Sequence, residues 1–243
     1  MKPKKSYKRG YPVAILVGIE ANQAALWRIY SNVAKHEKTI PLNDAENSPK
    51  AQYNFYEATI NALRPTLKEG VRSIIIASPA KSNCAKNFLN HIQTHHTWLT
   101  QGPNKTVISE ITGSARTQPE VAALAKNPIF RQTINETTAQ ESENIIDTME
   151  KRLNTSSQDA LVLYEFTEIE TAILTPWKPS KPKPEFLLLT DVYLANARAK
   201  NRLNRLMQIA ANRNIQTRIL NAESPAGKRL TQLGGITLLT KAT

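Results

Sequence analysis

The stretch NAESPAGKRLTQLGGITLLTK, residues 221–241, carries the full pattern of a helix that leads into a strand. Ser224 is a favoured helix cap, and Pro225 fits the first helical position, where its missing N–H costs nothing. Two turns follow, and Gly234 with Gly235 ends the helix because glycine readily adopts positive φ. The apolar residues from Ile236 onward predict a short buried strand. The glycine pair is interpreted as a helix stop rather than as a phosphate-binding loop.

The same order of strand, cap, proline and helix occurs in the first half, where IIIASPAK occupies residues 74–81. Steps of this kind from strand to helix are typical of α/β folds. Further strands are predicted from apolar runs at 13–19, 24–30, 106–111, 160–164, 186–190 and 217–220. Helices are expected at 55–67, 79–96, 137–153, 167–174 and 191–212, with a short one opening at Pro119, and the polar residues 35–52 are expected to form a loop.

A short polar segment, NTSSQ at residues 154–158, is the best candidate for a domain boundary because it contains no apolar anchor. The sequence therefore predicts an α/β protein with two α/β domains, at residues 11–154 and 158–243. The alternating elements of the second domain indicate a three-layer α/β/α sandwich. Residues 1–10 are expected to be a basic disordered arm, which either touches RNA or is a linker from a preceding domain.

Composition points to a polyanionic partner. The 243 residues carry a net charge of +12 with a pI near 9.8, and this balance favours nucleic acid, including ribosomal RNA, over plain solubility. No apolar run approaches the roughly 18 residues of a membrane span, and the basic N-terminus lacks the apolar segment of a signal peptide. Cys84 is the only cysteine, which excludes an internal disulfide and a cysteine-rich zinc site. A cytoplasmic monomer without a cofactor is expected.

Basic residues are the candidate binding residues. In the predicted helix 191–212, three arginines lie opposite the apolar face, and they form an anion-binding patch unless they are simply solvated. Lysine and arginine in the last helix extend the same patch. The candidate RNA-binding residues are Lys2, Lys4, Lys5, Lys8 and Arg9 in the arm, Arg198, Arg202 and Arg205 in that helix, and Lys228 and Arg229 in the last helix.

Catalytic and metal signatures are weak. His91 and His95 stand one helical turn apart, a spacing that suits a metal ion, but their helix offers no carboxylate or cysteine at a matching position. We therefore interpret these histidines, with His96, as polar residues of a surface helix and expect no metal site. Cys84 has no neighbouring histidine in the sequence and is interpreted as structural. No nucleophile elbow, phosphate-binding loop or zinc protease motif occurs.

The ordered motifs of the chain resemble the Pelota and archaeal–eukaryotic class-1 release-factor family. The pattern S-x-x-G-x-x-L-x-x-L-G-G-I near the end of the chain resembles the end of those proteins. It is carried here by Ser224, Gly227, Leu230, Leu233, Gly234, Gly235 and Ile236. Earlier matches are Phe55-Tyr56-Glu57, the strand ending in Ala-Ser-Pro at Pro79 with Phe88-Leu89 after it, Gly113-Ser114 before Glu120-Val121, Glu141, Tyr164 with Glu168, Ile169 and Ala172, and Leu188 to Asp191.

The resemblance implies an RNase H-like central domain followed by an L7Ae-like domain. It implies a factor of ribosome rescue that binds the ribosome (rRNA or tRNA), a translational GTPase of the elongation factor 1-alpha type and a ribosome-recycling ATPase. The chain departs from the family in lacking the N-terminal decoding-site domain. It also lacks the Gly-Gly-Gln of release factors, since residues 35–52 contain no glycine and Gln52 stands alone.

Three hypotheses follow. The first is a Pelota-like factor of ribosome rescue and translation quality control that acts by binding and not as an enzyme. The second is a divergent peptidyl-tRNA hydrolase related to release factors. The third is an L7Ae-like RNA-binding module without ribosome-rescue activity. Hydrolysis of peptidyl-tRNA on ribosomes separates the second from the first, and binding to naked kink-turn RNA favours the third.

Overall fold

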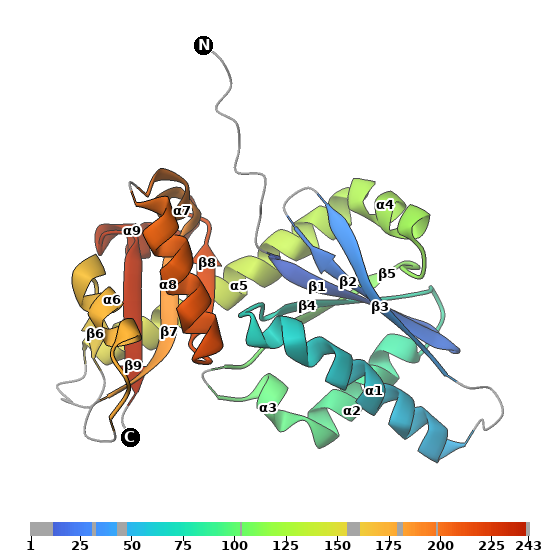
Figure 1. Ribbon diagram of the computed structural model, residues 1–243. Helices are drawn as coiled ribbons and strands as arrows, with labels where there is room; N and C mark the ends of the chain where they lie inside the picture. Colours follow the sequence, from blue (N-terminus) through green and yellow to red (C-terminus); the bar gives the residue numbers. More distant parts are fainter. Residues whose placement is uncertain are drawn as a thin grey trace, which may run out of the picture. The chain divides into compact units, whose positions relative to one another are not determined.

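The computed structural model describes residues 12–30, 33–42, 48–102, 104–154, 161–178, 182–197 and 199–241 (Figure 1). The chain forms two compact units, each with one mixed β-sheet. The N-terminal unit consists of Lys8–Leu67 and Val71–Glu141, and the C-terminal unit is built mainly from Ser142–Thr243. The predicted α/β class with two domains is therefore confirmed. None of the helices within the described ranges has the length and apolar character needed to cross a membrane.

The sheet of the N-terminal unit has the strand order β3-β2-β1-β4-β5. Its strands β1, β2 and β3 pair antiparallel, whereas β4 runs parallel to both β1 and β5. The strands β1 and β4 are buried along their whole length, which explains their continuous apolar sequences. The strands are β1 (Ala14–Ile19), β2 (Gln23–Ile29), β3 (Ala34–Pro41), β4 (Ser73–Ser78) and β5 (Val107–Thr112).

Helices cover both faces of this sheet. Because side chains alternate along a strand, Ile74 and Ile76 of β4 belong to one apolar cluster, and Ile75 and Ala77 belong to the other. The first cluster includes residues of α1 (Pro49–Lys68), α2 (Cys84–His95) and α3 (Thr97–Thr100). The second includes residues of α4 (Gln118–Lys126) and of the first part of α5 (Pro128–Leu153).

The expectation of a loop at residues 35–52 is wrong. Most of its first half forms β3, and α1 begins at Pro49, while residues 43–47 lie outside the described part. The strand β3 pairs only with β2 and thus lies at an edge of the sheet, where Ile40 is its single buried residue. An edge strand with polar side chains shows no apolar alternation, so its sequence looks like that of a loop.

Several helix bounds also differ from the prediction: α1 begins at Pro49 rather than at residue 55, and α5 begins at Pro128 rather than at residue 137. The helix expected from Pro79 begins at Cys84, after a turn in which Lys81 adopts positive φ. The single helix expected at 191–212 is two helices, α7 (Asp191–Asn196) and α8 (Lys200–Asn212). Between them the sequence contains no glycine or proline, so the break has no local signal in the sequence.

The C-terminal unit has a four-stranded sheet in the order β6-β9-β7-β8. One apolar cluster joins this sheet to α6 (Phe166–Leu174), α7 and α8, and another joins it to α9 (Pro225–Gln232) and the second part of α5. This is the predicted three-layer arrangement. The strands are β6 (Val162–Leu163), β7 (Lys183–Thr190), β8 (Gln216–Leu220) and β9 (Ile236–Lys241).

The helix and strand expected from residues 221–241 are present. Ser224 Oγ accepts a hydrogen bond from the backbone N–H of Gly227 at 3.0 Å and so caps α9. Gly234 and Gly235 have φ of +94° and +81°, and they turn the chain into β9. Because β9 pairs with both β6 and β7, this last strand lies inside the sheet. The strand β9, with which the sequence pattern of residues 221–241 ends, is thus a core element of the C-terminal unit.

The two units divide within α5, between Glu141 and Ser142, and not at the predicted linker 154–158. The reason is packing. Phe130 and Ile134 of α5 pack in the core of the N-terminal unit, whereas Ile146 and Met149 belong to a core cluster of the C-terminal unit. The sequence NTSSQ follows the end of this helix, and its residues 155–158 lie outside the described part. A polar segment after a helix therefore indicated the end of an element, not the end of a domain.

Candidate RNA-binding surface

Six of the ten candidate RNA-binding residues lie beyond the described ranges. These are the five basic residues of the arm, Lys2, Lys4, Lys5, Lys8 and Arg9, together with Arg198. The structure places the other four on α8 and α9 of the C-terminal unit. Two of these four, Arg202 and Arg229, form ion pairs with acidic side chains, although Arg202 is itself exposed.

Arg202 on α8 forms an ion pair with a carboxylate of the same unit. Its guanidinium donates hydrogen bonds to both carboxylate oxygens of Glu170 on α6, at 2.6 Å for Nε to Oε1. The hydrogen bonds from Arg202 are the largest influence on the pKa of Glu170. They outweigh the opposing effect of partial burial and hold this pKa below its usual value. The guanidinium also lies 5.0 Å from the ring centre of Phe166. Arg202 therefore ties α6 to α8, and little of its charge is left for RNA.

Arg229 on α9 also forms ion pairs within the chain. It forms ion pairs with Glu143 and Glu150, both in the second part of α5, and the Glu150 contact measures 3.1 Å. The spacing of the two glutamates, seven residues apart, places them on one face of α5 two turns from each other. Arg229 thus fixes α9 against α5, and we assign it a structural role.

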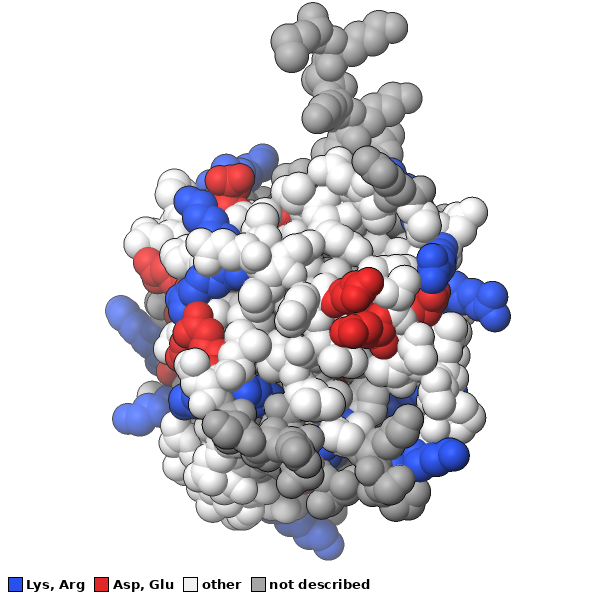
Figure 2. All heavy atoms as spheres, turned by 90° about the vertical axis from the view of Figure 1, so that its left-hand side faces the viewer, with Lys and Arg blue, Asp and Glu red and all other residues white. Residues whose placement is uncertain are grey.

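Arg205 and Lys228 remain as exposed cations. Both side chains are exposed, and neither takes part in an ion pair among those found within the described ranges. Figure 2 shows one face of the molecule, on which lysine and arginine side chains lie mainly towards the edge, while the middle is mostly uncharged apart from a small group of acidic side chains. The basic residues of that face are dispersed rather than gathered into one dense patch. The arginine stripe expected from helical spacing is therefore reduced, in the described part, to Arg205.

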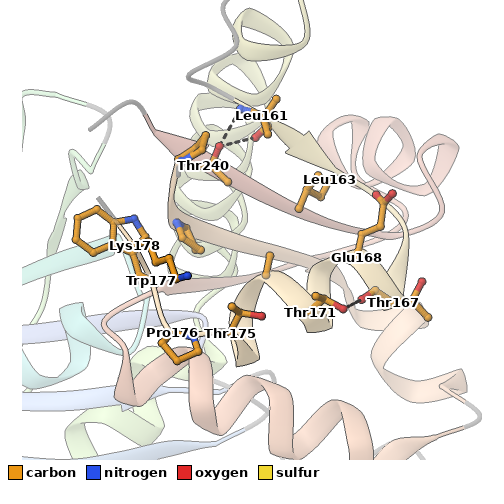
Figure 3. Close-up of a pocket in the computed structure, with 13 residues that line it drawn as sticks. Leu161, Leu163, Thr167, Glu168, Thr171, Thr175, Pro176, Trp177, Lys178 and Thr240 are labelled. Atoms are coloured by element: carbon orange, nitrogen blue, oxygen red, sulfur yellow. Dashed lines mark hydrogen bonds between the residues drawn. The ribbon is translucent and has the colours of Figure 1, made fainter. Parts of the chain in front are cut away.

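A shallow pocket lies beside β6 and α6 in the C-terminal unit (Figure 3). Its volume is about 450 Å³, and its walls are mainly apolar or carry threonine hydroxyls. At the edge of the pocket the Thr240 hydroxyl accepts a hydrogen bond from the Leu161 N–H and donates one to the Leu161 carbonyl, to which the Thr240 backbone N–H also donates. Trp177 is 44% exposed. The lining residues are Leu161, Leu163, Thr167, Glu168, Thr171, Ala172, Thr175, Pro176, Trp177, Lys178, Pro182, Pro184 and Thr240. This chemistry suits an apolar group rather than a reaction.

The turn that follows β5 is held by a polar network. Ser114 Oγ donates to Glu20 at 2.5 Å, and Thr117 with Glu120 forms a capping box at the start of α4. Although partial burial acts to raise the pKa of Glu120, hydrogen bonds led by the Thr117 backbone lower it below its usual value. The Ala115 carbonyl accepts a hydrogen bond from Trp27 Nε1 at 2.7 Å. A Cβ at Gly18 would lie 2.5 Å from that carbonyl oxygen, so β1 needs glycine there.

Gln52 lies within α1, where its side-chain amide donates to Tyr56 Oη at 3.0 Å. A helical glutamine that is held by a neighbour one turn away does not resemble the tip of a flexible glycine-rich loop. The position of Gln52 gives no support to a catalytic role.

Two of the three histidines at 91–96 are not the surface residues that the sequence indicated, whereas His95 is exposed as expected. His91 and His96 are 7% and 6% exposed, and both approach Glu57 of α1. These three form the one group of potential metal ligands found within the described ranges. Sequence spacing pointed to His91 with His95 instead. The carboxylate lies 34 residues before His91 on another helix, so no local spacing could have revealed it.

Comparisons with known proteins show what this chain is similar to. No protein-family model matches the chain. The chain is 27% identical over 199 residues to the Pelota homologue of Methanococcus maripaludis strain C5, and 28% identical over 199 residues to that of strain C7. Each match covers 82% of this chain and 51% of the relative. The chain thus spans about half the length of the curated relatives it matches.

Two solved structures support the fold. Saccharomyces cerevisiae Dom34 is described as a translation termination-like factor of RNA quality control that interacts with Hbs1. It aligns with a TM-score of 0.54 and 19% identity, over 95% of this chain and 62% of that one. An archaeal Pelota bound to the ribosome with ABCE1 aligns with a TM-score of 0.55 and 16% identity, over all of this chain and 65% of that one. Together with the sequence matches, they show that most of the chain is similar to Pelota proteins, in sequence and in fold.

Proposed function

We propose that this chain is a Pelota-like factor of ribosome rescue and translation quality control, which works by binding in the cytoplasm and not by catalysis. The observation that carries this proposal is the similarity to Pelota homologues, which extends over 82% of the chain and therefore includes parts of both units. The excess of positive charge supports a ribosomal partner, because rRNA and tRNA are polyanions.

The proposed protein partners follow from the same relatives. Dom34 interacts with Hbs1, and an archaeal Pelota has been described on the ribosome with ABCE1. We propose a translational GTPase and a ribosome-recycling ATPase as the corresponding partners of this chain. The mainly apolar pocket beside β6 and α6 is a candidate contact for a protein, since Glu168 and Lys178 are the only charged residues among the described residues that line it.

We predict that ribosome binding falls with salt, and that two arginines of α8 contribute unequally. Each cation that meets a phosphate adds about 0.9 to the slope of log affinity against log salt on duplex, and about 0.7 on single strands. Arg205→Gln should lower this slope by up to that amount, whereas Arg202→Gln should leave it nearly unchanged because Glu170 already binds Arg202. The measurement is co-sedimentation of the full chain with ribosomes over a series of salt concentrations.

The arm provides the second half of this test. Deletion of residues 1–10 removes five basic residues and should lower the slope more than Arg205→Gln does. A chain that does not sediment with ribosomes at low salt would refute the proposed function. If it sediments but neither variant changes the slope, the ribosome contact lies elsewhere and Arg205 is only a solvated charge.

The alternative enzyme, a divergent peptidyl-tRNA hydrolase, makes a distinct prediction. Gln52→Ala should leave the release of peptide from ribosome-bound peptidyl-tRNA at the background rate seen without the protein. The physical reason is that Gln52 is fixed in α1 by its bond to Tyr56. Rapid release by the parent chain that is lost in Gln52→Ala would establish the hydrolase. Lys50→Ala, an exposed change on the same helical turn, serves as the control.

The third candidate is an L7Ae-like RNA-binding module. The three-layer arrangement of the C-terminal unit is the observation that favours it. Tight binding to a naked kink-turn RNA in the absence of ribosomes would support it. Under the proposal made here, such binding should be weak and should not discriminate between a kink-turn and a plain duplex of equal length, because the contacts are mainly electrostatic.

A further inference from the structure

We propose that Glu57, His91 and His96 form a binding site for one divalent transition-metal ion of the zinc class. The site lies where α1 passes the end of α2 in the N-terminal unit, whereas the candidate RNA-binding residues of α8 and α9 belong to the C-terminal unit. The proposal is independent of the ribosome-rescue function.

The geometry brings three ligand atoms together. Glu57 Oε1 lies 3.1 Å from His91 Nε2 and 2.6 Å from His96 Nε2, and the three atoms lie within 4.8 Å of one another. Zinc binds imidazole nitrogen and carboxylate oxygen at about 2.0–2.2 Å, so the ligand atoms of a tetrahedral site lie about 3.3 Å apart. The two distances from Glu57 are shorter than that value, and since all three ligand atoms lie within 4.8 Å of one another, modest side-chain rotations would suffice to reach it.

The ligand types select the metal. Two imidazoles and one carboxylate suit zinc, cobalt or nickel, whereas magnesium and calcium prefer sites made of oxygen ligands. Three protein ligands leave the fourth tetrahedral position to water. The side chain of Glu57 is 27% exposed, so an ion can enter from solvent along this carboxylate.

The protonation states favour a metal at two of the three groups. Burial lowers the pKa of His91 below its usual value, which favours the neutral form of the imidazole. Partial burial acts to raise the pKa of Glu57, but hydrogen bonds from His96 and His91 outweigh it and lower that pKa overall. A carboxylate held in its ionised form is the form that binds a cation.

Trp98 competes with metal binding at His96, the third ligand. Its Nε1 donates to His96 Nδ1 at 3.3 Å, which places the proton of a neutral His96 on Nε2, the atom that the metal needs. Metal binding must therefore move that proton to Nδ1 and break the Trp98 hydrogen bond. The bond is longer than usual, and the Trp98 side chain is 39% exposed and free to turn away. Trp98 thus weakens the site without blocking it.

The test is a titration of the full chain, without a polyhistidine tag and stripped of metal by a chelator, with Zn²⁺ in equilibrium dialysis. We expect one equivalent to bind, and a Co²⁺ titration to give the visible absorption of a four-coordinate site. Glu57→Gln and His96→Gln should each weaken binding at least tenfold, since each removes one of three ligands. Glu57→Gln keeps the size of a partly exposed side chain, and far-ultraviolet circular dichroism verifies that each variant is folded.

Two further variants make the test specific. His95→Gln is the matched control, because His95 lies beside His91, with ring centres 4.8 Å apart, but contributes no atom to the ligand group. It should bind like the parent chain. Trp98→Phe removes the competing N–H while keeping a smaller aromatic ring, and it should tighten binding roughly two- to tenfold, the equivalent of one ordinary hydrogen bond. Failure of the parent to bind a stoichiometric ion, or equal binding by Glu57→Gln, would overturn the proposal.

Discussion

Replacing Trp27 with alanine should destabilise the N-terminal unit by about 3–5 kcal/mol, the usual cost of removing a buried aromatic side chain. Trp27 is 2% exposed and belongs to the apolar cluster between the sheet and α4 with α5. Its loss also leaves the buried Ala115 carbonyl without the 2.7 Å hydrogen bond from the indole. The change therefore removes both packing and the support of the turn after β5.

The two contributions can be separated. Trp27→Phe keeps an aromatic ring but removes the N–H, so it should cost less than the alanine change, with about 1–3 kcal/mol from the unsatisfied carbonyl. Hydrogen exchange measured by mass spectrometry resolves the effect, because peptides of β1 and β4 should lose protection while those of β7 and β9 keep it. Equal exchange in Trp27→Ala and the parent chain would show that this cluster does not stabilise the unit.

Replacing Gly227 with alanine should destabilise the C-terminal unit by about 3 kcal/mol, the upper end of the usual overpacking penalty. A Cβ at Gly227 would lie 1.9 Å from the Asn221 carbonyl oxygen and 2.8 Å from Ala222 Cα. These are backbone atoms and cannot turn aside as a flexible side chain would. Gly227 also donates its N–H to the capping Ser224, so any shift of the helix start breaks the cap.

The neighbouring residue provides the control for this change. Lys228 is exposed on the same helix, and Lys228→Ala should alter stability by no more than about 0.5 kcal/mol. We expect the slowly exchanging amides of β7 and β9 to lose protection in Gly227→Ala only. Unchanged protection there would mean that the segment before α9 moves freely, and that Gly227 has no steric role in the S-x-x-G pattern.

The sequence was most informative where a strand is buried on both faces. The runs at β1, β4 and β7 were predicted because burial on two sides leaves no polar position in the pattern. The edge strand β3 was missed for the opposite reason, since most of its side chains meet solvent. The break between α7 and α8 depends on tertiary packing, and the residues around it contain no local signal.

The candidate sites were predicted less well because their partners are distant in the sequence. Helical spacing placed Arg202 and Arg205 on a polar face, but it could not indicate that Glu170, on α6, holds one of them. The same holds for Arg229, whose partners Glu143 and Glu150 lie about 80 residues earlier. The charge of a residue is visible in a sequence, whereas the neutralisation of that charge requires the fold.

The continuous helix α5 limits where genetic recombination can separate the two units of this protein. Recombination joins modules at points where each module keeps all of its own layers. A genetic crossover at the codons for NTSSQ would leave the C-terminal sheet without Ile145, Ile146 and Met149, which cover one of its faces from α5. A crossover before α5 would take Phe130 from the other sheet. Lineages that carry this pair of units should therefore gain, lose or exchange them together.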